Sequence, residues 1–155
     1  MTHPHDQATA YHEAGHVVLA LALGRQVHAV NILPNGERLG VCAFRKAAFR
    51  PSEDWIEREI LIALGGIAAE ARHTGVHAWE AAGRDWQYVR DLVVKRAGER
   101  RAERLASRLL SKADHLLAKA GHWRAVEQIA AALLKNGTVS GRAVRHLFEQ
   151  CRNEH

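Results

Sequence analysis

The sequence predicts a mainly α-helical (α+β) fold, with a small N-terminal β-hairpin or sheet and a C-terminal helical bundle. Apolar residues recur at three- and four-residue spacing through most of the 155-residue chain, which is the period of helices with one buried face. Only residues 27–33 and 39–44 read as strands, and a Pro-Asn-Gly turn signal at 34–36 separates them. The sequence contains neither a low-complexity linker nor an internal repeat. We therefore expect one domain over residues 1–155.

The N-terminal part combines a helix with the hairpin. The first helix is expected from Asp6, a good N-cap residue, to Leu23, with Gly24 as its stop. Residues 27–33 then form a β-rich run, and residues 39–44 return across the turn as its partner strand.

A second long helix follows, and Ser52 is predicted as its N-cap. Residues 73–83, with two glycines and two histidines, are interpreted as a loop. A third helix begins at Asp85. The inward-facing residues of the two helices are Ile56, Ile60, Ala63, Leu64, Ile67, Ala68 and Ala71, then Val89, Leu92 and Val93.

The fourth helix has the clearest helical period and is predicted to end at Gly121. Two further helices are expected at 123–134 and 140–151, separated by an Asn-Gly pair at 136–137. The apolar face of the fourth helix comprises Ala102, Leu105, Ala106, Leu109, Leu110, Ala113, Leu116, Leu117 and Ala120.

Hydropathy argues against a membrane protein or a secreted one. The longest apolar run, residues 17–23, is far shorter than the roughly 18 residues of a transmembrane helix. The N-terminus reads Thr-His-Pro-His-Asp after the initial methionine and has no basic region ahead of an apolar one. We therefore expect a cytoplasmic protein with no membrane partner.

The charge distribution does not favour nucleic-acid binding. The formal net charge is +5, but the basic residues of 95–104 alternate with acidic ones. No nucleic-acid motif accompanies them, so we expect no nucleic-acid partner. If the protein did bind nucleic acid through these residues, the binding would depend steeply on salt concentration. On a helix these charges would form solvated i, i+4 rows, namely Glu99/Glu103 and Arg100/Arg104/Arg108.

The segment HEAGH at residues 12–16 carries the chemistry. Histidines at i and i+4 of a helix lie roughly 6 Å apart along its axis and on one face. His12 and His16 can therefore each give a nitrogen to one Zn²⁺, and Glu13 can reach a water on the metal as general base. Gly15 costs about 1 kcal/mol relative to alanine inside a helix, which predicts close approach of another backbone.

A catalytic zinc site needs a third protein ligand, and Asp85 is the preferred candidate. It stands at the start of a helix on the side of the apolar stripe, where an acid is costly unless paired or coordinated. Glu70 is a candidate acceptor that would hold a ligand histidine by a hydrogen bond without binding the metal, with a solvated helix-end charge as the alternative. The other ligand candidates are Glu80, His73 and His77, and the two histidines are interpreted as ordinary loop residues.

These motifs resemble the peptidase domain of the FtsH-type, AAA-linked zinc proteases. The similarity runs through nearly the whole chain, and the motifs occur in the family's order. The loop before Asp85 departs from the family pattern, since it reads Gly-Arg-Asp where the family has Thr-Gly-Ala-x-Asn-Asp. The matching stretches are AYHEAGH at 10–16, the strand and turn 27–34, LGV at 39–41, LGGIAAE at 64–70, IAAALL at 129–134 and GTVSG at 137–141.

The resemblance implies a helical zincin-like metallopeptidase domain, here without the ATPase module, with Zn²⁺ as cofactor and Asp85 as the third ligand. It implies an endopeptidase for unfolded or flexible polypeptides, with a homo-oligomer or a separate ATPase partner both left open. A non-catalytic zinc-binding module is the rival interpretation. The four tryptophans are interpreted as core or interface aromatics. The resemblance also suggests substrate pairing along a strand, with a plain structural strand as the alternative, at Gly40, Val41, Cys42, Ala43 and Phe44.

Overall fold

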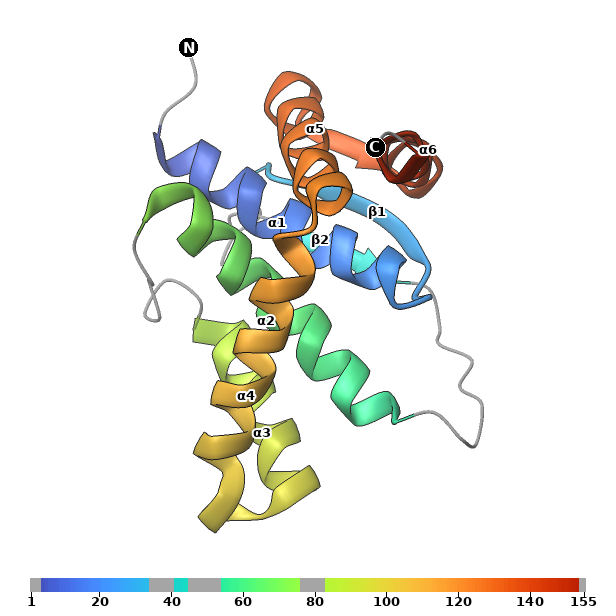
Figure 1. Cartoon of the computed structure of the whole chain (residues 1–155). Helices are drawn as coiled ribbons and strands as arrows, with labels where there is room; N and C mark the ends of the chain where they lie inside the picture. Colours follow the sequence, from blue (N-terminus) through green and yellow to red (C-terminus); the bar gives the residue numbers. More distant parts are fainter. Residues whose placement is uncertain (1–3, 34–40, 45–53, 76–82, 154–155) are drawn as a thin grey trace.

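The computed structural model describes residues 4–33, 41–44, 54–75 and 83–153. Helices dominate these residues (Figure 1), which confirms the mainly helical prediction. In chain order the elements are α1 (Pro4–Ala22), β1 (Val27–Asn31), β2 (Val41–Phe44), α2 (Trp55–Thr74), α3 (Gly83–Ala97), α4 (Glu99–Leu117), α5 (Ala120–Asn136), β3 (Thr138–Ser140) and α6 (Gly141–Asn153).

The centre of the fold is the crossing of α1 and α2, which pack backbone to backbone. A methyl group on Gly15 would overlap the Gly65 carbonyl and lie 2.5 Å from the Ala69 side chain. On α2, the same addition at Gly65 would lie 2.9 Å from both the Gly15 carbonyl oxygen and Leu19. The close approach predicted from Gly15 is therefore confirmed, and its partner is α2.

A three-stranded antiparallel sheet lies beside α1, in the order β2-β1-β3. The β1–β2 pairing confirms the predicted hairpin, with Val30 opposite Cys42. The third strand, β3, was missed, because three residues show no readable period and the Asn-Gly pair before it indicated only a helix break. Its pairing with β1 places Val139 opposite Val30.

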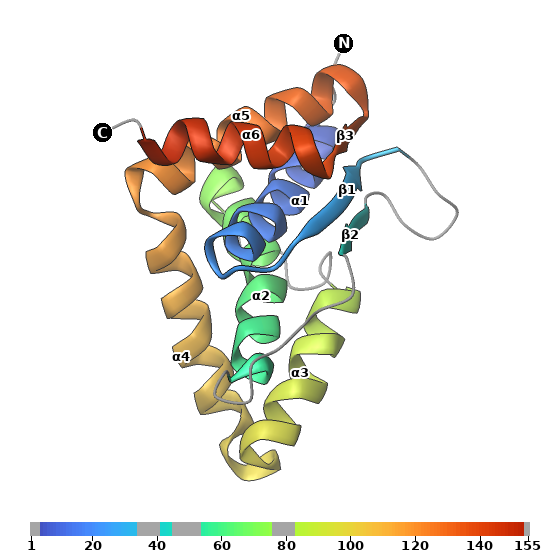
Figure 2. The ribbon, with the colours of Figure 1, turned by 90° about the vertical axis from the view of Figure 1, so that its right-hand side faces the viewer.

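The α3 and α4 helices form an antiparallel hairpin that packs against α2 and extends beyond it (Figures 1 and 2). Gly98 joins the two helices, with a φ of 83° that favours glycine. At the other end, α5 packs against α1, and α6 contacts α5, β1 and β3. The predicted stop at Gly121 was wrong: α4 ends at Leu117, and Gly121 lies within α5, in close contact with the Cys151 carbonyl of α6.

The starts of α1 and α2 differ from the prediction in their caps, and α3 and α5 begin at Gly83 and Ala120, two and three residues earlier than predicted. The α1 helix begins at Pro4, a residue favoured in a first helical turn, and Asp6 lies inside that turn instead of capping it. Asp54, and not Ser52, is the N-cap of α2: its side chain accepts a hydrogen bond from the Glu57 backbone N–H at 3.0 Å. Asp54 directly precedes the first turn of α2, so its side chain can reach the Glu57 N–H, which has no acceptor within the helix.

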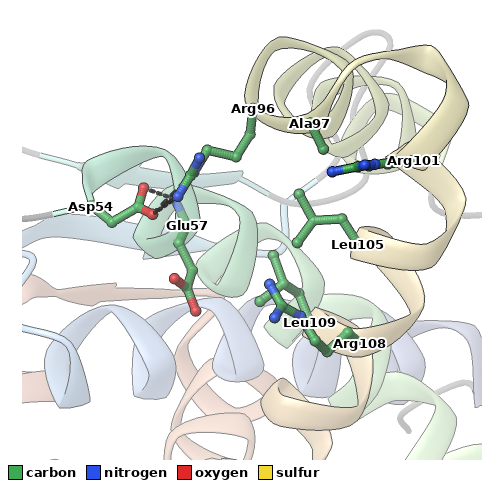
Figure 3. Close-up of a pocket in the computed structure, with 8 residues that line it drawn as sticks. All are labelled: Asp54, Glu57, Arg96, Ala97, Arg101, Leu105, Arg108 and Leu109. Atoms are coloured by element: carbon green, nitrogen blue, oxygen red, sulfur yellow. Dashed lines mark hydrogen bonds and ion pairs between the residues drawn. The ribbon is translucent and has the colours of Figure 1, made fainter.

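Ion pairs link the α2 start to the α3–α4 hairpin. The Arg96 guanidinium lies 3.0 Å from Asp54, and the Lys112 ammonium lies 3.0 Å from Glu57. Figure 3 shows the pocket at this junction, about 290 Å³ in volume, whose floor includes Leu105 and Leu109. None of the helices in the described part of the chain has both the length and the apolarity needed to cross a bilayer.

Candidate metal centre

The HEAGH segment lies in the middle of α1, where three polar side chains are buried. His12, Glu13 and His16 are 8%, 7% and 5% exposed. Their potential ligand atoms lie within 4.8 Å of one another. The two imidazole rings are one helical turn apart, with centroids separated by 4.7 Å and planes at 83°. Three buried ionisable side chains need hydrogen-bond or charged partners, because an uncompensated buried charge is strongly destabilising.

Asp85, in the first turn of α3, meets both histidines. Its Oδ2 atom lies 2.6 Å from His12 Nε2 and 3.1 Å from His16 Nε2. Ligand atoms on a tetrahedral Zn²⁺, each about 2.0–2.1 Å from the ion, would be roughly 3.3 Å apart. Asp85 Oδ2 therefore lies close enough to both Nε2 atoms for the three to bind one ion. Two imidazoles and one carboxylate also match the donors of three-ligand catalytic zinc sites.

The other nitrogen of each imidazole is held from α2. His16 Nδ1 donates to the Ile62 carbonyl oxygen at 2.8 Å, and His12 Nδ1 lies 3.2 Å from Glu70 Oε1. Because a carbonyl or carboxylate oxygen only accepts, these contacts place a proton on each Nδ1, and in the metal-free protein the Asp85 carboxylate accepts from each Nε2–H. Glu70 thus contacts the His12 nitrogen that does not face Asp85. The Ile62 carbonyl was not predicted, since a backbone acceptor leaves no signal in the sequence.

The electrostatics of the cluster favour a cation. Burial lowers the pKa of His12, but the hydrogen bonds to Asp85 and Glu70 and the charge of Glu13 outweigh it and raise that pKa to about 10. Burial likewise lowers the pKa of His16, and the charge of Asp85 reverses the shift to a raised value. For Asp85, burial raises the pKa, and the two histidines together bring it far below its usual range. A divalent cation would satisfy the same carboxylates without these protons.

Gly66 on α2 is a further residue of the site. A methyl group there would lie 2.5 Å from His16 Nε2 and 2.8 Å from His12 Nε2. The α2 backbone therefore packs directly against both imidazoles. Two adjacent glycines, Gly65 and Gly66, are unfavourable inside an apolar helix. From the sequence, this pair could have predicted that another part of the protein packs closely against α2.

The other predicted ligand candidates and the predicted substrate strand are not part of the His12–His16–Asp85 cluster or lie outside the described residues. His73 does not lie in a loop: it belongs to the last turn of α2, and its ring stacks on Tyr11. His77, Glu80 and Gly40 lie outside the described residues. The predicted substrate strand is β2, which pairs only with β1 in the part of the chain that the structure describes and is an edge of that sheet.

Comparison with known proteins points to one family. The model of Peptidase family M41 matches residues 1–99, which include all of the site residues named above. A relative 40% identical over 68 residues is the ATP-dependent zinc metalloprotease FtsH 1 of Rhodopirellula baltica, with 41% of this chain and 10% of that protein aligned. The FtsH protease of Magnetococcus marinus is 38% identical over 93 residues, covering 57% of this chain and 14% of that protein.

A third relative, FtsH 3 of Sorangium cellulosum, is 42% identical over 67 residues, covering 41% of this chain and 11% of that protein. The aligned part of the chain thus spans about a tenth to a seventh of the length of these relatives. The family match extends from α1 to the end of α3 and covers more than half of the chain. The chain therefore belongs to Peptidase family M41, as an FtsH-type peptidase domain.

Proposed function

We propose that this protein is a zinc-dependent endopeptidase that hydrolyses peptide bonds of unfolded or flexible polypeptides. The observation that carries the proposal is the convergence of His12 Nε2, His16 Nε2 and Asp85 Oδ2 on one point beside Glu13. The three relatives are named as zinc metalloproteases, which supports the same metal and the same reaction class.

The residues divide into ligands and a base. His12, His16 and Asp85 would hold Zn²⁺, which when bound supplies Lewis-acid chemistry for the peptide carbonyl and a nucleophilic water near neutral pH. The Glu13 carboxylate accepts a proton from the attacking water and returns it to the leaving amine nitrogen. Glu13 suits this task because the helix places it next to His12 while its own ligand atom stays within 4.8 Å of both histidines.

The edge strand β2 supports an extended substrate. A polypeptide that pairs with a strand edge must itself be extended at that point, and flexible or unfolded chains reach an extended conformation more readily than compactly folded ones. Residues 41–44 are the described part of that edge. We therefore propose flexible or unfolded chains as the substrate class.

The test is cleavage of an unstructured protein by the zinc-loaded chain, beside Glu13→Gln. We expect cleavage that a chelator abolishes, and a variant that binds zinc with similar affinity but does not turn over. Activity in Glu13→Gln would contradict the role of Glu13.

The relatives are named as ATP-dependent, and this favours a second candidate: a protease subunit that needs a separate ATPase partner or self-assembly. If the purified chain binds zinc but cleaves only after an ATPase is added, this second candidate is correct. If zinc binds and no condition gives cleavage, the chain is a binding module.

A further inference from the structure

A stack of aromatic rings lies beside the metal centre and joins three helices. The Tyr11 ring on α1 stacks on the His73 ring of α2, with centroids 3.7 Å apart and planes within 4°. On α5, the Trp123 ring centroid lies 5.9 Å from that of Tyr11, with a tilt of 35°. The Arg72 guanidinium lies 4.9 Å from the Trp123 ring centroid. Ring pairs and guanidinium–indole contacts of this kind are attractive beyond simple burial.

The stack is next to the hydrogen bond that orients His12. Tyr11 directly precedes His12 on α1, and His73 follows Glu70 by one helical turn on α2. The His12 Nδ1–Glu70 contact of 3.2 Å and the Tyr11–His73 stack are therefore adjacent cross-links between the same two helices. Residues three apart on a helix share a face, so a shift of the His73 backbone also moves Glu70.

Glu70 sits at the start of the last turn of α2, where a helix needs support. The Glu70 carbonyl accepts a hydrogen bond from the Thr74 hydroxyl at 2.9 Å. Gly75 ends the helix with a φ of 80°, and its N–H donates to the Ala71 carbonyl. Terminal turns open most easily when few tertiary contacts hold them. The stack on His73 is such a tertiary contact, and it comes from α1 and, through Trp123, from α5.

We propose that the Tyr11–His73–Trp123 stack is a positioning element of the metal centre, which holds the last turn of α2 so that Glu70 keeps His12 oriented. The zinc-dependent part of this inference rests on the proposed function. The inference also gives α5 a part in the centre, although α5 lies beyond the residues 1–99 that match the family model. The rings act through Glu70 and touch neither substrate nor the reacting atoms.

The first measurement uses the metal-free full chain, so it does not depend on zinc binding or activity. At fixed neutral pH, the ¹⁵N and proton shifts of His12 Nδ1–H report its hydrogen bond to Glu70. We expect Tyr11→Leu to move these shifts toward those of Glu70→Ala, and Trp123→Leu to move them less. Tyr11→Phe, which keeps the ring, should leave them unchanged. Unaltered shifts in Tyr11→Leu would overturn the proposal.

The second measurement is a double-mutant cycle on zinc affinity, by competition with a chelator. Loss of an outer-shell partner lowers metal affinity by about 10- to 100-fold, so Glu70→Ala should fall in this range and Tyr11→Leu on the order of 3- to 10-fold. If Tyr11 acts through Glu70, adding Tyr11→Leu to Glu70→Ala causes no further loss. Additive losses would show an effect that bypasses Glu70 and would overturn the proposal.

Two matched controls separate positioning from general stability. Trp55→Leu removes a tryptophan that also has a cationic partner, the Lys95 ammonium at 5.2 Å from its ring, but lies at the opposite end of α2. Phe148→Leu removes a ring on α6 that stacks on His122 of α5, with centroids 5.8 Å apart. Both should leave the zinc affinity and the His12 shifts at wild-type values. If wild-type protein binds no zinc while the metal-free shifts respond as expected, the proposed function fails and the positioning role stands.

Discussion

The α1–α2 crossing and the junction between the α2 start and the α3–α4 hairpin are held by different contacts. At the crossing, Gly15, Gly65 and Gly66 bring two backbones together and press one of them against the imidazoles. The hairpin packs on α2 through buried apolar residues such as Val89, Leu109 and Ala113. Its junction with the α2 start is bridged by the exposed ion pairs Asp54–Arg96, drawn in Figure 3, and Glu57–Lys112. Yet the hairpin also supplies Asp85 to the centre.

This difference indicates where the protein is sensitive to change. Close-packed interiors resist the addition of even one methyl group, whereas exposed ion pairs contribute little. The two histidines therefore sit at the close-packed crossing of α1 and α2, and Asp85 reaches them from the first turn of α3. The following substitutions, from the largest expected effect to the smallest, test this contrast.

Gly15→Ala should cause the largest loss of stability. The overlap with the Gly65 carbonyl is expected to cost about 3 kcal/mol, against about 1 kcal/mol gained in helix propensity, so the net loss is about 2 kcal/mol. Urea unfolding of the metal-free protein measures it. Gly83→Ala is the matched control, because an added methyl group there meets nothing within 4 Å. Equal stability of the two variants would contradict the backbone contact.

Gly66→Ala should damage the centre more than the fold. The new methyl group would displace the imidazoles of His12 and His16, and we expect zinc affinity to fall by about 10- to 100-fold, as for other changes that reorient ligands. Chelator competition measures the affinity, and circular dichroism verifies the fold. An unchanged affinity would mean that the rings can move away without cost.

Asp54→Ala should destabilise the junction by about 1 kcal/mol, the usual contribution of an N-cap. The variant loses the acceptor for the Glu57 N–H and the partner of Arg96. Thermal unfolding measures the change, and zinc affinity should stay at the wild-type value. A loss of zinc affinity would show that the junction and the centre are coupled through α2 or α3.

The charge of Asp54 predicts a pH dependence at the same site. The Glu57 N–H lowers the pKa of Asp54, burial opposes this, and Arg96 lowers the pKa further. A folded-state pKa below the unfolded one gives stability that is present above the unfolded pKa, about 3.9, and is lost as pH falls through the folded value. The stability difference between wild type and Asp54→Asn should therefore shrink below about pH 4. A difference independent of pH would contradict the shift.

Lys112→Met should have the smallest effect, about 0.5 kcal/mol or less, because Lys112 and Glu57 form an exposed pair. Chemical unfolding at low and high salt measures it. A loss as large as that of Gly15→Ala would remove the distinction between the two regions.

Residues close together in sequence could be predicted well. The apolar periods identified the long helices, and the Pro-Asn-Gly turn identified the β1–β2 hairpin. The spacing of His12 and His16 placed both on one face of α1, since a helix fixes that geometry within five residues. Boundaries such as Gly121 and Ser52 were wrong, because a cap depends on which donors and acceptors the neighbouring elements leave unsatisfied.

The sequence by itself determined the helical fold class, the hairpin and the two histidines with Glu13, because each is encoded in a short window by a fixed backbone period. Only the tertiary structure decided that Asp85 meets both imidazoles, that Ile62 and Glu70 hold their other nitrogens, and that Trp123 reaches Tyr11. These contacts join residues from 46 to 112 positions apart. No local pattern specifies them, because they depend on how whole helices pack.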